Sequence, residues 1–554
     1  MSVGPRVSVV VAVYNAGEYL EILTDSLLAQ SLAPGEFEVI FVDDGSTDGS
    51  GDRVEALAAA HPHMRAIHIP NSGWPGRPRN IGIDAARGRY VYFVDHDDWI
   101  APEALERLAD RADRNEADVV IGKEVAHGSF GVPLIQFARS IDDEPFPSDV
   151  LVALLTPHKL FRRSMLDERG IRFPEGRRRL EDHHFVIQAY FAARRISILA
   201  DYPCYHWIER REKANATHSR IDPVGYYANM REILDIVDAN MAPGEARDHL
   251  YAHWFRGKTL HKLRGPRWFG PTLSRDARGL LEEVRHITAD RFGPAIDRHV
   301  GLRYRIAARA VRRGSDALLA AHARFTQGIG LSIEVKEVTP GPWHLDLDLD
   351  LALHGPDRAP LAFERRDGVT KWLAPIEFGD PAVGPDDLVV DDAELQRTAL
   401  NVLARHRGTW VTYHSSVPFP LSASGDGVLR AAGSMRLSLD LATMAAGGPL
   451  PDGTWDLFVQ LECCGWRGSR RIPGLQLQRE ATHGLPTRPY VTSAGTLALV
   501  VEGSAAPKLT GPPEPAAPIK PPLTSADRLR RTARRLPQPV RRMGRALLDL
   551  RPGR

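Results

Sequence analysis

Three aspartates stand almost side by side in the stretch YVYFVDHDDW, residues 90–99. Asp95, Asp97 and Asp98 follow an apolar run that ends at the first of them. Because side chains alternate along an extended chain, an Asp-x-Asp at a strand end directs both carboxylates to one side. Such oxygen ligands suit Mg²⁺ or Mn²⁺, which share their other coordination positions with waters and substrate phosphates. The cluster predicts a divalent metal that carries a diphosphate; an acidic turn capping the helix that begins near Pro102, with Asp98 or a neighbour as N-cap, is the alternative.

Two further polar segments follow strand-like runs. VIFVDDGSTDGS places Asp44 at a strand tip, where it could accept a hydrogen bond from a base or a ribose; an Asx-type turn with a helix cap is the alternative. NSGWPGRPRNIG supplies Arg77 and Arg79 on a glycine-rich approach, suited to offsetting phosphate charge. Each arginine could instead be a solvated residue at a helix start.

The elements that must position these clusters alternate between short apolar runs and helical patterns. We expect helices between the strands, and strands over residues 6–13, 36–42, 64–69, 89–94 and 118–125. Strands that are apolar on both faces and separated by helices indicate a parallel sheet covered on both sides. Ligands of such sheets bind at the carboxyl ends of the strands, and the polar clusters fall at those ends.

Beyond the first 221 residues the pattern changes twice. Residues 222–327 read as a helical connector, and from 328 to 503 period-two alternation predicts a β-sandwich-like domain. A Pro-rich linker (504–524) and a basic amphipathic tail (525–554) follow.

The composition of the 554-residue chain is that of a globular protein, with 43% hydrophobic and 25% charged residues and a mean hydropathy of −0.27. The net charge of +1 conceals a tail that is strongly positive on a mildly acidic body. That asymmetry favours an anionic surface as the partner of the tail and argues against nucleic acid along the protein. Three cysteines without metal-binding spacing fit a reducing cytoplasm, and no apolar stretch approaches the roughly 20 residues of a membrane span.

In their order and spacing, four motifs together resemble the family 2 glycosyltransferases of the GT-A fold. They are VSVVVAVYNAGEYL, VIFVDDGSTDGS, RNIGIDAARGRYVYFVDHDDW and RRLEDHHF. As a set they are specific, whereas a lone Asp-x-Asp is not. The resemblance implies an α/β, Rossmann-like GT-A domain with a mostly parallel sheet, over residues 1–221, that binds a nucleotide-sugar donor.

The resemblance also implies roles for single residues at the nucleotide end. Tyr14 would lie against the nucleobase and Asp44 would bind it, while Asn71 and Arg79 would hold the nucleoside and the diphosphate. Ala12 stands where the family usually has proline, and a backbone contact survives that change.

At the reacting end, the resemblance makes Asp95 and Asp97 the ligands of Mn²⁺ or Mg²⁺. The Glu181-Asp182 pair matches the family's acidic element that deprotonates the acceptor hydroxyl, with Asp182 as the base and Glu181 on the donor sugar or orienting Asp182. One in-line displacement would then invert the anomeric centre. The alternative is that both residues only cap the helix that follows.

A basic segment, HWIERREKANATHS (206–219), could form a flap over the donor. In the resemblance, this region carries an Arg and a His/Ser pair that reach the diphosphate, so Arg211, His218 and Ser219 are candidates. A solvated loop is the alternative.

The layout of the whole chain resembles that of bacterial enzymes that attach N-acetylglucosamine to poly(ribitol phosphate) wall teichoic acid. In those enzymes the C-terminal region mediates self-association, so residues 328–503 are candidates for forming a homo-oligomer. Five tryptophans of this region are candidates for stacking on sugars or for the core: Trp343, Trp372, Trp410, Trp455 and Trp466. The tail suits peripheral contact with an anionic membrane; a disordered basic tail is the alternative.

We therefore expect a metal-dependent, inverting glycosyltransferase that moves a sugar from a donor such as UDP-GlcNAc to a hydroxyl of a cell-envelope polymer or glycan. We expect it in the cytoplasm, at or near the inner face of the membrane, with a polymeric glycan or polyol-phosphate acceptor. A nucleotidyltransferase is less favoured because the turn after the first strand, YNAGEYLE, has one glycine and no basic residue. A non-catalytic glycan-binding or assembly protein on a degenerate transferase fold is the alternative from another class.

Overall fold

The computed structural model describes residues 4–128, 132–210, 221–269, 272–375, 378, 384–423, 427–475 and 484–511. Arg211, His218 and Ser219 of the expected flap lie outside the described residues, as does the basic tail 525–554. The domain boundaries drawn from the sequence stay predictions.

Within the described residues, the N-terminal sheet has eight strands in the order β3-β2-β1-β4-β7-β6-β8-β5. Their bounds are β1 Val7–Val13, β2 Phe37–Asp43, β3 Met64–His68, β4 Tyr90–Asp95, β5 Trp99–Ile100, β6 Val119–His127, β7 Lys159–Arg162 and β8 Ile196–Ile208. The five expected strands are all present, and β3, β2, β1 and β4 run parallel to one another. The predicted α/β fold with a mostly parallel sheet is confirmed.

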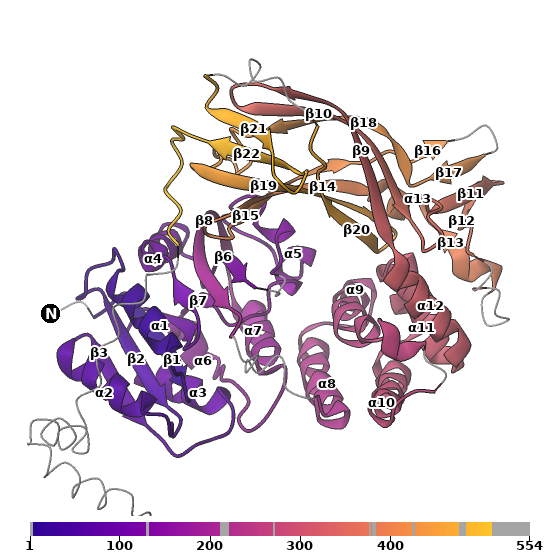
Figure 1. The fold of residues 1–554 in the computed structure, drawn as a ribbon. Helices are drawn as coiled ribbons and strands as arrows, with labels where there is room; N and C mark the ends of the chain where they lie inside the picture. Colours follow the sequence, from indigo (N-terminus) through magenta and orange to yellow (C-terminus); the bar gives the residue numbers. More distant parts are fainter. Residues whose placement is uncertain are drawn as a thin grey trace, which may run out of the picture. The chain divides into compact units, whose positions relative to one another are not determined.

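Seven helices of this domain lie in the described part of the chain. They are α1 Tyr19–Leu28, α2 Ser50–Ala60, α3 Gly76–Ala85, α4 Ala104–Asn115, α5 Asp149–Val152, α6 Arg163–Glu168 and α7 Glu181–Ala192. Alternate strand residues pack in two separate apolar clusters, one on each face of the sheet. Val9 and Val11 cluster with side chains of α1, α2 and α4, whereas Val10 and Phe93 cluster with side chains of α3 and α7. Figure 1 labels these helices around the sheet. Burial on both faces explains why these strands read as continuous apolar runs.

Two strands of the sheet had no clear sequence signal. β7 inserts antiparallel between β4 and β6, and β8 pairs parallel with β6. β7 is only four residues long, and β8 lies in a stretch whose pattern is mixed, so neither stands out from the sequence alone. Both strands matter to the site, because the residues that precede β7 and those at the end of β8 contact the aspartate cluster.

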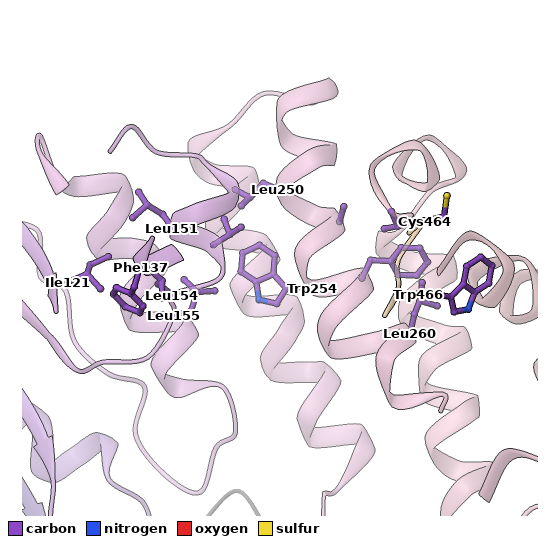
Figure 2. Close-up of a cluster of buried hydrophobic side chains, with 14 of the residues drawn as sticks. Ile121, Phe137, Leu151, Leu154, Leu155, Leu250, Trp254, Leu260, Cys464 and Trp466 are labelled. Atoms are coloured by element: carbon purple, nitrogen blue, oxygen red, sulfur yellow. The ribbon is translucent and has the colours of Figure 1, made fainter. Parts of the chain in front are cut away.

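The helical connector packs against the N-terminal domain through a continuous apolar core. Its helices are α8 Pro223–Asn240, α9 Glu245–Trp254, α10 Arg275–Arg291, α11 Leu302–Arg313 and α12 Asp316–Gly328. Figure 2 shows buried side chains that lead from Ile121 of β6 through Leu151 and Leu154 to Trp254 of α9. Trp254 is fully buried, and its indole N–H donates to Nδ1 of His183 in α7 over 3.2 Å. The connector therefore shares one core with the domain that carries the acidic pair.

After the connector, the described chain forms antiparallel sheets, as the period-two pattern predicts. The strands are β9 Gly330–Pro340, β10 His344–His354, β11 Ala362–Arg366, β12 Val369–Trp372, β13 Val389–Val390, β14 Ala399–His406, β15 Thr412–Pro418, β16 Ser422–Ala423, β17 Val428–Arg430, β18 Ala432–Asp440, β19 Gly453–Cys463, β20 Trp466–Arg471, β21 Thr487–Val491 and β22 Leu497–Val501, with the short helix α13 at Asp392–Gln396. The three cysteines of the chain are buried and form no disulfide.

The tryptophans of these sheets divide between the two expected roles. Trp372, Trp455 and Trp466 are buried in the core, and Trp343 is half-buried against it. Trp410 is 38% exposed and has a φ of +62°. The core interpretation therefore holds for most of them, and Trp410 alone of the five keeps a large exposed surface.

Among the described residues, no helix combines the length and the apolar character needed to cross a bilayer.

Candidate active site

The strand ends of the parallel sheet bring the predicted polar clusters to one edge. Ala12 of β1 pairs with Asp95 of β4, and Val13 pairs with Asp43 of β2. Helix α3 lies close against β1, because a Cβ at Gly82 would come within 2.2 Å of the Val10 side chain. This close approach positions Arg79, which stands one turn earlier on α3.

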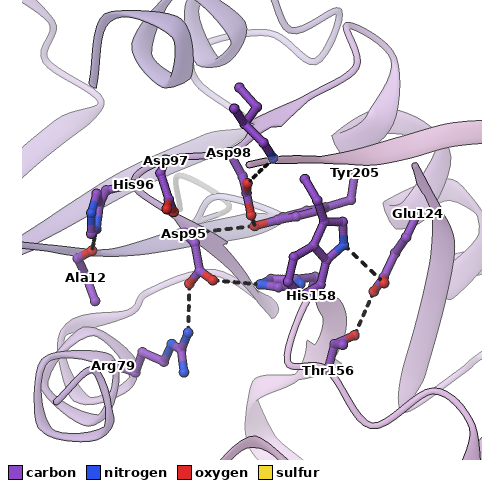
Figure 3. Close-up of polar contacts among 12 residues, drawn as sticks. Ala12, Arg79, Asp95, His96, Asp97, Asp98, Glu124, Thr156, His158 and Tyr205 are labelled. Atoms are coloured by element: carbon purple, nitrogen blue, oxygen red, sulfur yellow. Dashed lines mark hydrogen bonds and ion pairs between the residues drawn. The ribbon is translucent and has the colours of Figure 1, made fainter. Parts of the chain in front are cut away.

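Asp95 is held from two sides (Figure 3). Nη2 of Arg79 donates to Oδ1 of Asp95 over 2.7 Å, and Nε2 of His158 lies 3.3 Å from Oδ2. Burial alone would raise the pKa of Asp95, but the charges of Arg79 and His158 hold it well below its usual range. The protein's own groups therefore keep this carboxylate ionised and oriented.

The other two aspartates have different environments. Nε of Arg210 donates to Oδ2 of Asp97 over 2.8 Å. The carboxylate of Asp98 is buried and accepts from the hydroxyl of Tyr205 over 2.6 Å and from the backbone N–H of Ile208 over 2.8 Å. Burial, together with the charges of Asp97 and Asp95, raises the pKa of Asp98 well above its ordinary value.

The helix-capping alternative for the aspartate cluster is wrong. Helix α4 begins at Ala104, and its N-cap is Glu103, which makes no side-chain cap. Asp98 instead bonds to β8, so the cluster is tied to a strand more than 100 residues away.

At the predicted nucleotide end, the residues lie near one another at the ends of β1 and β2. The side chain of Asp44 accepts from the backbone N–H of Ser72 over 2.8 Å, and Nδ2 of Asn71 donates to the carbonyl of Asp44 over 2.9 Å. Tyr14 is 45% exposed, as a side chain that meets a ligand would be. The carbonyl of Ala12 lies 3.0 Å from Nδ1 of His96.

The turn alternative does not hold for Asp44 itself, whose side chain bonds to Ser72. It does hold for its neighbours: Oδ1 of Asp43 accepts from the backbone N–H of Ser46 over 3.2 Å, and Oδ1 of Asp48 accepts from that of Ser50, the first residue of α2, over 2.9 Å. The two arginines also separate: Arg77 is exposed at the start of α3, as the solvated alternative had it, and Arg79 is buried.

Arg79 links the aspartate cluster to the acidic pair. Its Nη2 contacts Asp95, and its Nη1 lies 3.7 Å from Oε1 of Glu181. Burial works against the charge of Arg79, but Asp95 and Glu181 outweigh it and raise its pKa. A cation between two carboxylates of separate elements ties the Asp-x-Asp strand end to the start of α7.

Glu181 and Asp182 form the first turn of α7, after Leu180 at a φ of +66°. The N-cap position itself is Leu180, which makes no side-chain cap. Oδ1 of Asp182 accepts from the backbone N–H of His183 over 2.8 Å, so the capping alternative holds in part for Asp182. Burial and the charge of Asp182 raise the pKa of Glu181 to about 7, with Arg79 opposing the shift. The two neighbouring acids thus differ in environment, which is a common way for proteins to assign different tasks to paired carboxyl groups.

The acidic pair lines a cavity of about 540 Å³ that is also lined by several basic residues. Arg179 comes from the same segment as the pair, and the connector supplies Lys258, Lys262, Arg264 and Arg267, which we call the basic wall. This part of the connector is built from short irregular turns: a π-helical turn at Phe255–Thr259 and 3-10 turns at Leu260–Lys262 and Pro266–Trp268. Burial and the charges of Lys258, Arg179 and Arg267 lower the pKa of Lys262 to about 8. His261 also lines the cavity, but burial and neighbouring cations lower its pKa to about 4.

Glu181→Gln should change how stability depends on pH. Because folding raises the pKa of Glu181 from 4.5 to about 7, the proton-linked stabilisation is full below pH 4.5 and is lost as the pH rises through 7. We expect the free energy of unfolding of the variant, relative to that of the wild type, to increase by up to about 3 kcal/mol from pH 5 to pH 9. Chemical denaturation at both pH values measures this, with the exposed Glu168→Gln as the control. Equal stability differences at the two pH values would contradict the buried, proton-linked state of Glu181.

The residues at the strand end fit a divalent cation. Asp95 is 30% exposed at its side chain and Asp97 13%, so both carboxylates reach the edge where a diphosphate would lie. Hard carboxylate oxygens are the ligands that Mg²⁺ and Mn²⁺ prefer. Asp95, Asp98 and His158 also bring potential ligand atoms within 4.8 Å of one another. In that trio, however, Asp98 is only 3% exposed and both of its carboxylate oxygens accept from protein donors, so Asp97 is the better partner for Asp95.

Three residues of the site were missed from the sequence: His158, Tyr205 and Arg210. Each contacts an aspartate of the cluster from β8 or from the segment before β7. The one available signal was HWIERR at 206–211, which was interpreted as a flap; its Arg210 contacts Asp97.

A parallel sheet whose strand ends carry the Asp-x-Asp, facing an acidic helix start, defines a protein of the GT-A class. Residues 8–201 match the model of glycosyl transferase family 2, and residues 223–323 match that of the glycosyl transferase TarS linker domain. Glycosyltransferase GlyG of Streptococcus pneumoniae is 31% identical over 212 residues, which are 35% of this chain and 68% of GlyG. The chain belongs to the family 2 glycosyltransferases.

Two further matches concern poly(ribitol-phosphate) glycosyltransferases. The poly(ribitol-phosphate) beta-glucosyltransferase of Bacillus spizizenii is 34% identical over 236 residues, which are 42% of this chain and 37% of that protein. The crystal structure of TarS 1–349 from S. aureus in complex with UDP-GlcNAc matches with a TM-score of 0.52 and 26% identity, over 62% of this chain and 96% of that one. This chain thus spans less than half the length of the curated poly(ribitol-phosphate) relative.

Proposed function

We propose that the protein is an inverting glycosyltransferase that moves a sugar from a UDP-sugar, such as UDP-GlcNAc, to a hydroxyl of a polyol-phosphate polymer. The observation that carries this proposal is the shared cavity: the Glu181-Asp182 pair and the basic wall line the same cavity of about 540 Å³. An acceptor whose phosphates lie on the basic wall would present its polyol hydroxyls to the acidic pair. The resemblance to poly(ribitol-phosphate) enzymes supports the same acceptor class.

Of the two acids, Asp182 is the better general base. A hydroxyl must lose its proton as it attacks, so the base has to be ionised and within hydrogen-bond reach. Glu181 has a raised pKa and lies beside Arg79, which suits it to hold the donor sugar or to orient Asp182. Attack from the side of Asp182, opposite the leaving diphosphate, inverts the anomeric centre.

The donor would lie along the strand ends. Tyr14, Asp44 and Asn71 border the nucleobase and nucleoside, and Asp95 and Asp97 hold Mn²⁺ or Mg²⁺. When bound, the cation offsets the charge that develops on the leaving diphosphate. Arg79 fixes Asp95 and Glu181 relative to each other, so the donor end and the acid pair keep one geometry.

The remaining partners are also part of the proposal. We place the protein in the cytoplasm, with its tail 525–554 on anionic lipid and residues 328–503 available for self-association. Equal liposome binding by a chain that ends at residue 505 would refute the role of the tail.

A nucleotide panel tests the donor site and a polymer assay tests the reaction. We expect UDP to bind more tightly than GDP, dTDP or CDP by calorimetry, and its affinity to rise strongly when Mn²⁺ or Mg²⁺ is present. Incubation of a UDP-sugar with poly(ribitol phosphate) should then add the mass of one residue of that sugar per modified unit, an N-acetylhexosamine in the case of UDP-GlcNAc, with a β linkage from an α-linked donor. If none of the four nucleotides binds with metal present, the aspartates are structural and the degenerate-scaffold alternative takes over.

A further inference from the structure

His158 occupies a fixed place behind the Asp-x-Asp. It directly precedes β7, is 1% exposed, and brings Nε2 to 3.3 Å from Oδ2 of Asp95. This distance is at the long end for an N–H···O bond. The ring must therefore be held in place by its packing if it is to orient the carboxylate.

Aromatic packing provides that hold (Figure 3). The His158 ring stacks on Tyr205 with centroids 4.0 Å apart and planes 15° apart, and it meets Trp207 edge to face at 4.7 Å. The indole N–H of Trp207 donates to Glu124 over 3.2 Å, and Glu124 accepts from Thr156 over 2.6 Å. The imidazole therefore lies in a slot whose walls are themselves hydrogen-bonded.

The same tyrosine connects His158 to the rest of the cluster. Its hydroxyl donates to Asp98 and accepts from the backbone N–H of Asp95 over 3.1 Å. His158 and Tyr205 thus fix the side chain of Asp95, its backbone and the side chain of Asp98. Asp97, which bonds to Arg210, is left outside this network.

His158 is better placed to orient a ligand of the cation than to be one. Its Nε2 already faces Asp95, and its Nδ1 is buried with no hydrogen-bond partner among the described residues. Hydrogen bonds to ligating side chains tune metal affinity, and their loss typically costs about 10–100-fold.

We propose that His158 is a positioning residue that presets the Asp95 carboxylate for the cation that carries the donor diphosphate. The inference rests on the proposed function, since it concerns the same donor site. Its specific expectation is that His158 contributes to the metal-dependent part of nucleotide binding and leaves the metal-free part unchanged.

The test uses the full chain with UDP and Mn²⁺ as probes. His158→Phe keeps a ring in the slot but cannot donate, and we expect it to lose about 10-fold or more in UDP affinity with Mn²⁺ and nothing without it. His158→Gln can still donate to Asp95, and we expect it to stay within about 3-fold of the wild type. Mn²⁺ paramagnetic resonance in the presence of UDP should show the bound-metal signal weakened in the phenylalanine variant and retained in the glutamine variant.

His322→Phe, at a buried histidine of α12, is the matched control for replacing a buried imidazole. Circular dichroism and melting temperature of all variants report on folding. Equal losses with and without Mn²⁺, or a wild-type Mn²⁺ signal in His158→Phe, would overturn the positioning role while the proposed function stands. If the wild type itself fails to bind UDP with Mn²⁺, the proposed function and this inference fall together.

Discussion

Asp182→Asn should abolish sugar transfer while leaving the donor site intact. The asparagine is nearly isosteric but cannot accept the proton of the attacking hydroxyl, and loss of a positioned base typically costs about 10²–10⁴-fold in rate. We expect kcat for transfer to poly(ribitol phosphate) to fall by that factor and the Kd of UDP with Mn²⁺ to change by less than about 3-fold. Steady-state transfer rates and calorimetry measure the two quantities.

Replacing the other acid of the pair, in Glu181→Gln, should have a different effect. Because Glu181 has the raised pKa and lies beside Arg79, we expect its replacement to act mainly on donor binding, with a smaller loss of kcat than in Asp182→Asn. If Asp182→Asn keeps full transfer activity and Glu181→Gln does not, the two roles are exchanged.

Charge reversal on the basic wall should weaken binding of the acceptor polymer and leave binding of the donor nucleotide unchanged. Lys262 and Arg267 line the same cavity as the acidic pair, and burial beside other cations lowers the pKa of Lys262 to about 8. A charge-assisted hydrogen bond contributes about 1.5–3 kcal/mol. The double variant Lys262→Glu/Arg267→Glu should therefore raise the KM for poly(ribitol phosphate) by roughly 10²-fold or more, with UDP binding unchanged.

The salt dependence of the same reaction shows whether the KM rises because a contact with phosphate is lost or because the cavity is distorted. The wild-type KM for the polymer should rise steeply with ionic strength, and the double variant should lose most of that slope. Arg298→Glu, at an exposed position elsewhere in the connector, serves as a single charge-reversal control and should leave the KM near wild type. An unchanged KM in the double variant would mean that the acceptor does not lie on the basic wall.

Local patterns were sufficient to predict the first strands of the sheet. β1, β2 and β4 are apolar on both faces, and each ends in a polar cluster, so both the parallel sheet and the active edge could be predicted. β7 is too short to be distinguished in this way, and β8 lies in a stretch whose sequence shows no clear period.

The residues that bond to the three aspartates could not be predicted from the sequence either, but for a different reason. His158 meets Asp95, Tyr205 meets Asp98 and Arg210 meets Asp97 across 63 to 113 positions of sequence. No local spacing encodes contacts of that kind; they follow from the order in which β7 and β8 join the sheet. The sequence could indicate which residues do chemistry, but only the fold shows what holds them.

The shared core around Trp254 has a consequence for acceptor choice under the proposed function. Trp254 bonds to His183, the residue after Asp182, and the connector that carries it also carries Lys258 and Lys262. The distance between Asp182 and the lysines that would contact phosphate is therefore fixed by the fold. Polymers would be sorted by how far a free hydroxyl stands from its phosphates, so that a backbone unit with one carbon fewer or more would be held out of register even if every group matched in kind.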